Sequence, residues 1–179
     1  VWGRDNLTES ALASVSMGYQ VSVTPLQMLS AISAVANQGV YMQPRVVRAL
    51  EKDGRRLTVR PKPRQPAVIS AETAASMTRI MEQVVERGTG TDAKIPGYSV
   101  AGKTGTANKL INGRYSTSTH ASFVGFVPST APALAVLVML DSPHGVHGHF
   151  GGPVAAPIFR RIAEASLSYH GVPQTVNPP

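Results

Sequence analysis

Apolar residues recur at helical spacing in three segments of the chain. The first segment follows Thr24 and Pro25, which suit a helix N-cap and a first helical position, and it ends before Gly39. Because this segment has almost no polar face, we expect its helix to be buried in a larger body. The second segment covers residues 71–87 and the third residues 154–168. The pattern therefore predicts three helices.

Shorter apolar runs predict five strands. Three of them cover residues 98–109, 121–127 and 134–140, and the short polar connectors between them favour antiparallel neighbours. One of these connectors, residues 115–120, is interpreted as a hairpin loop. Two more strands are predicted within residues 45–59, around an Asp-Gly dipeptide that suits a tight turn.

The composition favours one folded domain. The chain has 179 residues, of which 42% are hydrophobic and 15% charged, and these values argue against intrinsic disorder. We expect a single domain over residues 1–173, followed by a tail or linker at 174–179. Because the chain has no cysteine, it offers neither a disulfide framework nor a thiolate metal site.

The net charge of +7 is concentrated in one stretch of the chain. Between residues 44 and 64, only Glu51 and Asp53 oppose eight basic residues, which are Arg45, Arg48, Lys52, Arg55, Arg56, Arg60, Lys62 and Arg64. The alternation of arginine with apolar residues favours a solvated hairpin, and an anionic surface such as membrane headgroups is the alternative. Motifs that read nucleic acid are missing, so no nucleic acid partner is expected.

The candidate chemistry is concentrated in residues 97–106, which read GYSVAGKTGT. Residues 97–104 fit the phosphate-binding pattern G-x-x-x-x-G-K-[ST], and the run 134–141 resembles an apolar strand that ends in a magnesium-binding aspartate. A P-loop, however, must follow a buried strand and open a helix. Residues 91–96 are no buried strand, and residues 105–113 resist helix formation. A nucleotide hydrolase is therefore disfavoured.

The same stretch contains Lys103-Thr104-Gly105-Thr106, a signature of serine acyl-transferases that include penicillin-binding proteins and many β-lactamases. Because side chains alternate along a strand, Thr104 and Thr106 share one face, and Lys103 and Gly105 share the other. A substrate that touches all four must lie along the edge of the strand. There Gly105 permits close approach, hydroxyls and Lys103 suit a carboxylate, and an amide can stabilise an oxyanion. A core strand with a solvated lysine is the alternative.

Over most of its length the chain resembles the C-terminal part of a class B penicillin-binding protein, a monofunctional transpeptidase that cross-links peptidoglycan. Beyond the Lys-Thr-Gly-Thr signature, the resemblance rests on GYQVSVTPLQ at 18–27, AVANQG at 34–39, GTGT at 88–91, SFVGFVP at 122–128 and GGPVAAPIF at 151–159. It implies the C-terminal portion of the penicillin-binding/β-lactamase-like transpeptidase fold. This is an α/β fold of the α+β type, with an antiparallel sheet packed against helices and no cofactor.

The resemblance also assigns roles to the signature. Lys103 would support proton transfer around the nucleophile, and the backbone N–H of Thr106 would supply half of the oxyanion hole. Thr104 and Thr106, beside Gly105, would bind the carboxylate of the terminal D-alanine of the donor stem peptide, or that of penicillin. The implied reaction is attack of a serine on a D-Ala-D-Ala amide, followed by resolution of the acyl-enzyme by an amine of a neighbouring stem peptide.

Partners and compartment follow from the same resemblance. Stem peptides and β-lactams would bind at the site, and the cell-wall synthesis machinery would be a partner at the membrane. The implied location is the bacterial cell envelope, at the outer face of the cytoplasmic membrane. No apolar run approaches the roughly 20 residues that span a bilayer, and the chain starts at Val1 without a methionine, so we expect an anchor upstream. Division, elongation and sporulation roles stay open.

The chain departs from the family pattern in one respect, because no serine stands in Ser-x-x-Lys or in Ser-x-Asn. We therefore expect the nucleophile, its lysine and the second serine in an upstream segment of the same protein. The isolated chain is expected not to react with penicillin. Two other interpretations stay open: a β-lactamase or penicillin sensor, and a non-catalytic structural fragment whose site has decayed.

Three histidines, His144, His147 and His149, lie close together in the sequence. A solvated loop is favoured over a metal site, because the intervening glycines fix no geometry and Asp141 is the one nearby carboxylate. No metal is therefore expected.

Overall fold

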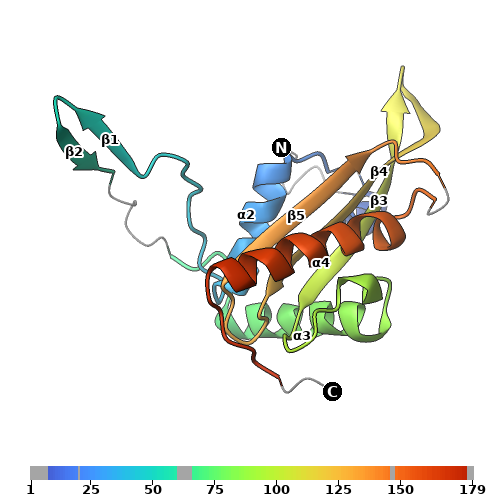
Figure 1. Ribbon diagram of the computed structural model, residues 1–179. Helices are drawn as coiled ribbons and strands as arrows, with labels where there is room; N and C mark the ends of the chain where they lie inside the picture. The colour runs from blue at the N-terminus through green and yellow to red at the C-terminus, as the bar shows by residue number, and fades with distance from the viewer. Residues whose placement is uncertain (1–7, 20, 60–65, 146–147, 177–179) are drawn as a thin grey trace.

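The computed structural model describes residues 8–19, 21–59, 66–145 and 148–176. Its elements are, in order, α1 (Glu9–Ser16), α2 (Pro25–Ala36), β1 (Ala49–Lys52), β2 (Arg55–Thr58), α3 (Ala71–Arg87), the short 3₁₀ helix η2 (Thr91–Ala93), β3 (Ala101–Ile111), β4 (Arg114–Val127), β5 (Leu134–Asp141) and α4 (Gly151–Tyr169). Strands β3, β4 and β5 form an antiparallel sheet in that order. Helix α4 lies across one face of this sheet and α2 lies behind the other (Figure 1). The predicted antiparallel sheet packed against helices is confirmed.

Separate core clusters cover the two faces of the sheet. On the α4 side, Phe123 and Phe159 are fully buried, with ring centroids 4.7 Å apart. On the other side, Phe126 packs with Ala101 of β3 and Met81 of α3. Because successive strand residues point to opposite faces, a slip of one residue in β4 would move both phenylalanines out of the clusters in which they pack. The core therefore fixes the register of the central strand.

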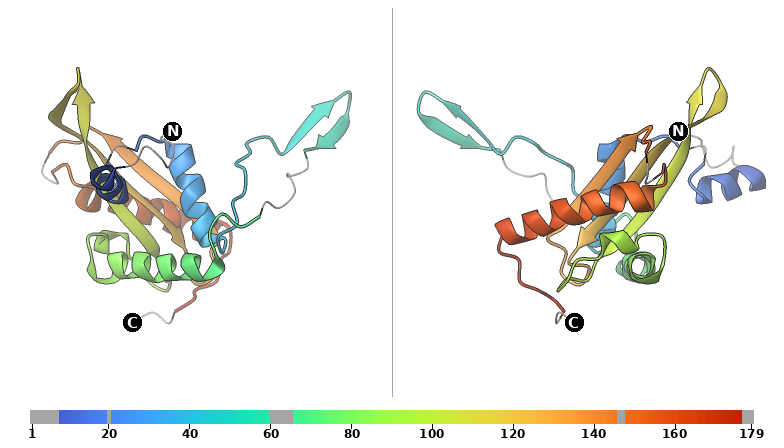
Figure 2. Two further views of the ribbon diagram at one scale, coloured as in Figure 1. Left: turned by 180° about the vertical axis from the view of Figure 1, so that it is seen from behind. Right: turned by 45° about the vertical axis from the view of Figure 1, so that its right-hand side comes forward.

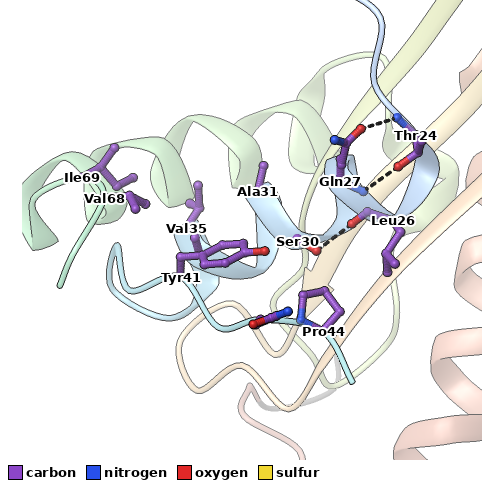
Figure 3. Close-up of a pocket in the computed structure, with 12 residues that line it drawn as sticks. Thr24, Leu26, Gln27, Ser30, Ala31, Val35, Tyr41, Pro44, Val68 and Ile69 are labelled. Carbon is purple, nitrogen blue, oxygen red and sulfur yellow. Dashed lines mark hydrogen bonds between the residues drawn. The ribbon is translucent and has the colours of Figure 1, made fainter. Parts of the chain in front are cut away.

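Two helices begin where the sequence predicts, and polar caps hold both starts. At α2, the Thr24 hydroxyl accepts from the Gln27 amide at 3.2 Å, and the Gln27 side-chain oxygen accepts from the Thr24 amide at 2.8 Å (Figure 3). At α3, the Ser70 hydroxyl accepts from the Thr73 amide at 3.1 Å. These bonds satisfy amides that have no acceptor within the first helical turn.

Helix α4 begins at Gly151, ahead of the predicted start at residue 154. The three additional residues, Gly151, Gly152 and Pro153, are of types that disfavour the interior of a helix. In the first turn, however, amides have no intrahelical acceptor, so Pro153 removes no hydrogen bond there. The early start brings the end of the helix close to the sheet.

Strands β1 and β2 form the predicted hairpin, with Asp53 and Gly54 at positive φ in its turn. The two strands are shorter than the predicted span of 45–59. The hairpin projects away from the rest of the molecule (Figures 1 and 2), and nearly all of its residues are exposed. This exposure agrees with a solvated hairpin. The basic residues at positions 60, 62 and 64 lie outside the described residues.

Two predictions about the sheet are wrong. Residues 115–120 do not form a loop, because they belong to β4, where Tyr115, Thr119 and His120 pair with residues of β3. Their polar side chains gave no apolar signal, although Thr119 is buried and donates to the carbonyl of His149 at 3.1 Å. Strand β3 begins at Ala101 instead of residue 98, because Tyr98 closes a turn by donating its amide to the Ile95 carbonyl at 3.1 Å.

The two ends of the described chain differ in their packing. Helix α1 was not predicted; it buries none of its residues and lies to one side of the sheet (Figure 2). At the other end, the amides of Thr175 and Val176 donate to the carbonyl of Gly97 at 2.9 and 3.2 Å. The described part of the predicted tail therefore packs against the turn that precedes β3.

Candidate active site

The signature residues 103–106 lie in β3, at one edge of the sheet. Within the described residues, β3 pairs with β4 and has no strand on its other side. An edge strand presents unpaired amides and carbonyls that can hydrogen-bond an extended ligand. The geometry that the sequence argument required, an accessible strand edge, is therefore present.

The direction of the backbone groups follows from the contacts of Gly105. Its carbonyl points toward β4, where the Ser122 hydroxyl lies 3.5 Å away. Residues of an antiparallel strand alternate between groups that face the partner strand and groups that face away from it. Since Gly105 pairs with Ser122, the backbone amides and carbonyls of Thr104 and Thr106 face the open edge. The amide that would serve an oxyanion is thus directed away from the sheet.

The side chains of Thr104 and Thr106 lie on the α4 side of the sheet. The Thr106 hydroxyl accepts a hydrogen bond from the amide of Gly151 at 3.1 Å. The Thr104 hydroxyl lies 2.7 Å from the hydroxyl of Thr89, which follows α3. The expected sharing of one face by the two threonines matches these contacts.

Lys103 is exposed, and its contacts hold it at the edge of the strand. Its ammonium donates to the Thr104 carbonyl at 2.8 Å and to the Thr104 hydroxyl at 3.3 Å. Among the described residues, no carboxylate forms an ion pair with Lys103. The ammonium of Lys103 therefore has no ionic partner among the described residues, and it is available to an anionic group or to a proton-transfer network.

The start of α4 lies directly above the β3–β4 pair. A Cβ added at Gly151 would lie 2.3 Å from the Ser122 carbonyl oxygen and 2.5 Å from the Gly105 carbonyl oxygen. A Cβ added at Gly152 would lie 2.5 Å from the Thr89 carbonyl oxygen. Only glycine allows this approach, which directs the positive end of the α4 dipole at the two threonines. An anion at the strand edge is favoured by the helix end and by Lys103.

The P-loop interpretation is wrong. A phosphate-binding loop would open a helix at Thr104, but residues 101–111 form strand β3. The preceding segment, around Gly97, is a turn with positive φ and not the end of a buried strand. The anion-binding amides of a helix are therefore missing from this motif.

A sizeable groove lies away from the signature residues. A groove of about 630 Å³ is lined by α2 and by residues such as Tyr41, Pro44 and Val68 (Figure 3). Its lining contains no lysine, arginine, histidine, aspartate or glutamate. A groove without a charged side chain does not suit acyl transfer, so chemistry and not volume identifies the site.

A polar cavity of about 360 Å³ lies near the start of α4. Both His144 and His149 line it, together with Thr117 and Ser142, while His147 lies outside the described residues. The part of the chain that the structure describes contains no group of three histidines or carboxylates that could hold a metal ion.

Sequence reasoning missed two contacts near the site. One is the Thr89–Thr104 pair, for which the glycines on both sides of Thr89 were the available signal. The other is an ion pair across the sheet between Lys109 of β3 and Asp141 of β5, with nitrogen and oxygen 2.5 Å apart. The hydrogen bonds of Lys109 and Ser142 hold the pKa of the Asp141 carboxyl below its ordinary value.

The sequence of the chain is similar to those of known proteins. A family described as the penicillin binding protein transpeptidase domain matches residues 2–164. Stage V sporulation protein D of Bacillus subtilis is 40% identical over 163 residues, covering 89% of this chain and 25% of that protein. The probable peptidoglycan D,D-transpeptidase PenA of Neisseria gonorrhoeae is 36% identical over 165 residues, covering 91% of this chain and 26% of that protein.

Solved structures agree with these sequence matches. The crystal structure of penicillin binding protein 3 from Mycobacterium tuberculosis, in its apo form, superposes with a TM-score of 0.86 at 32% identity, over 99% of this chain and 42% of that one. The transpeptidase domain of penicillin-binding protein 3 from Burkholderia pseudomallei gives a TM-score of 0.82 at 34% identity, over 98% of this chain and 51% of that one. The chain spans about a quarter of the length of the curated relatives that it matches.

Proposed function

The chain belongs to the penicillin binding protein transpeptidase domain family, and on that basis we propose that it forms one wall of the active site of a peptidoglycan D,D-transpeptidase. The observation that carries this proposal is the open edge of β3, where residues 103–106 bring two hydroxyls, one ammonium and free backbone amides together. A helix end adds a positive field at the same place.

In the proposed reaction, a serine hydroxyl attacks the amide between the last two D-alanines of a donor stem peptide. The bond to the terminal D-alanine breaks, the amine of that D-alanine takes a proton and leaves, and an acyl-enzyme remains. An amine of a neighbouring stem peptide then attacks the ester. This second step forms the cross-link and returns the proton to the serine.

Thr104 and Thr106 are proposed to bind the carboxylate of the terminal D-alanine, or that of a β-lactam in its place, and Gly105 to let the ligand approach. Their hydroxyls lie on the α4 side of the sheet, near the positive end of that helix. Hydroxyl donors and a helix N-terminus both stabilise a carboxylate. This arrangement supports carboxylate binding more strongly than a plain core strand would, because a core strand needs no exposed polar edge.

Lys103 and the Thr106 amide are proposed to act on the reacting atoms. The Thr106 amide faces the open edge, which suits donation to the oxyanion of the tetrahedral intermediate. Lys103 has no acidic partner among the residues described, and its ammonium reaches the Thr104 hydroxyl at 3.3 Å. A free cation in this position suits the proton-transfer network around the nucleophile.

The nucleophile is proposed to come from another segment of the same protein. The sequence contains neither Ser-x-x-Lys nor Ser-x-Asn, the two serine signatures of the family. Of the serines that the chain does have, Ser122 stands in β4, where its hydroxyl contacts the Gly105 carbonyl and no lysine. The chain alone is therefore proposed to be inactive.

The site is proposed to work in the bacterial cell envelope, with stem peptides as substrates and the cell-wall synthesis machinery as partners. The names of the relatives, a sporulation protein and probable peptidoglycan transpeptidases, support this setting. Of the helices described here, none has the length and apolar character to cross a membrane.

A fluorescent penicillin tests the proposed function. We expect the complete protein to form a covalent adduct whose labelled peptide, after proteolysis, lies outside residues 1–179. The chain alone should form no adduct at any of its serines. Absence of labelling in the complete protein, or labelling of a serine in this chain, would contradict the proposal.

A further inference from the structure

Thr89 stands in a turn whose backbone is held from two sides. On one side, the amides of Gly88 and Gly90 both donate to the Val84 carbonyl of α3, at 3.1 and 3.0 Å. On the other side, Gly152 of α4 approaches so closely that an added Cβ would lie 2.5 Å from the Thr89 carbonyl oxygen. The turn therefore has little freedom to move, and it places the exposed Thr89 side chain beside Thr104.

The Thr89 side chain contacts Thr104, with 2.7 Å between the two hydroxyl oxygens. Either oxygen can be the donor in this pair. A threonine hydroxyl has one proton to donate and two lone pairs that accept. The polarity of the Thr89–Thr104 bond therefore decides whether the Thr104 proton is used inside the protein or is free for a ligand.

The other partners of Thr104 limit which of the two hydroxyls can be the donor in the Thr89–Thr104 bond. Lys103 donates to the Thr104 hydroxyl at 3.3 Å, and an ammonium has no lone pair with which to accept. A carboxylate accepts hydrogen bonds and donates none. If Thr104 binds a carboxylate, its single proton must go to that ligand, and the Thr89 hydroxyl must donate to the lone pair that Lys103 leaves open.

We infer that Thr89 is a positioning residue that donates its hydroxyl proton to Thr104 and so leaves the Thr104 proton directed at the carboxylate of the substrate. The inference rests on the proposed function of the β3 edge. It adds a residue outside the Lys-Thr-Gly-Thr signature, and it assigns that residue a role in choosing anionic over neutral ligands. Thr89 itself is placed behind Thr104 and touches no reacting atom.

The test compares benzylpenicillin with its methyl ester, which lacks the negative charge, on the complete transpeptidase. Thr89→Val keeps the shape of the side chain and removes the donor. We expect it to lower the second-order acylation rate constant for the acid by about tenfold, the usual effect of losing one hydrogen bond near a charge, and to leave the rate for the ester within about twofold. Thr89→Ser should restore the acid rate. Thr91→Val makes the same change in the next 3₁₀ turn and should alter neither rate.

Three results would overturn the inference. An equal loss for the acid and the ester would indicate a structural role, and an increased rate for the acid would mean that Thr104 donates to Thr89. An unchanged rate for both ligands would mean that the pair has no role in binding the carboxylate. If the wild-type protein is not acylated at all, the proposed function fails instead.

A thermal double-mutant cycle tests the hydrogen bond without any ligand. Thr89→Val and Thr104→Val should each lower the melting temperature of the same protein, and the double variant should lower it by clearly less than the sum. Additive losses would mean that the two hydroxyls are not bonded, which overturns the inference independently of acylation.

Discussion

The amide of Gly151, the first residue of α4, donates a hydrogen bond to the hydroxyl of Thr106 at 3.1 Å. This bond joins the last helix of the described fold to the edge strand that carries the signature. It satisfies one of the amides that the first turn of a helix leaves without an acceptor. It also fixes the Thr106 side chain, so the position of α4 and the geometry of the strand edge depend on each other.

Gly151→Ala should disturb this contact. The added methyl group would lie 2.3 Å from the Ser122 carbonyl oxygen, so the end of α4 must move away from the sheet. Overpacking of this kind usually costs about 1–3 kcal/mol, which corresponds to a fall in Tm of about 3–10 °C for a chain of this size. Differential scanning calorimetry measures it. Pro153→Ala, at an exposed position in the same turn, is the matched control and should change Tm by much less. Equal losses of Tm for the two variants would mean that the close approach of Gly151 to the sheet does not cause the destabilisation.

Thr106→Val should impair acylation more than it impairs folding. The variant removes the acceptor of the Gly151 amide and, under the proposed function, a donor to the ligand carboxylate. We expect the acylation rate constant of the complete protein with penicillin to fall by roughly 10- to 100-fold, because hydrogen bonds to charged groups are the strong ones. Thr106→Ser should recover most of the rate. Acylation of the Thr106→Val protein at the wild-type rate would show that the Thr106 hydroxyl does not bind the ligand carboxylate.

The Lys109–Asp141 pair predicts how stability depends on pH. The pKa of Asp141 is lowered in the folded chain, chiefly by the hydrogen bond from Lys109. A carboxyl whose folded pKa is depressed stabilises the fold above its unfolded pKa, and this stabilisation is lost as pH falls through the lowered folded value. The free energy of unfolding should therefore decrease as the pH is lowered from about 5 through the acid range. Urea denaturation at several pH values measures this.

Asp141→Asn should flatten that acid dependence, because the titrating group is gone. Asp53→Asn, in the exposed hairpin turn, is the control and should keep the slope of the wild type. If Asp141→Asn and the wild type lose stability in parallel as the pH falls, the ion pair across the sheet does not account for the dependence.

The projecting hairpin and the core should respond very differently to the same kind of truncation. Leu50 in β1 is 58% exposed, whereas Met81 in α3 is 3% exposed and packs beneath Phe126. Leu50→Ala should change the free energy of unfolding by less than about 0.5 kcal/mol, and Met81→Ala should lower it by about 2–5 kcal/mol. A large loss for Leu50→Ala in chemical denaturation would show that the hairpin packs against something and is not simply solvated.

Local signals were enough to predict α2 and α3. Helix α3 covers the predicted residues because Ser70 caps its start and Gly88 follows its end, and both signals are local in sequence. The same holds for α2, whose capping box lies within four consecutive residues. The start of α4 was placed too late because the local preference of Gly151 and Gly152 opposes a helix, whereas their close approach to the sheet requires them there.

The features of the sheet and the site that could not be predicted depend on contacts between residues that are distant in the sequence. The polar half of β4 gave no periodic apolar signal, because residues 115–120 are polar or aromatic and most of them are partly buried or exposed. The alternation of Thr104 and Thr106 could be predicted, since it depends on the strand alone. The partners of these residues, Thr89 and Gly151, come from segments that meet β3 only in the folded chain, so no spacing rule identifies them.

The central claim is that the open edge of β3 holds the carboxylate of a peptide or β-lactam for attack by a serine from another segment. The most direct measurement is a crystal structure of the complete protein acylated by penicillin. The account predicts the ligand carboxylate within hydrogen-bonding distance of the Thr104 and Thr106 hydroxyls, the acyl oxygen at the Thr106 amide, and the ester on a serine outside residues 1–179. A penicillin carboxylate bound away from β3, or an ester on a serine of this chain, would contradict it.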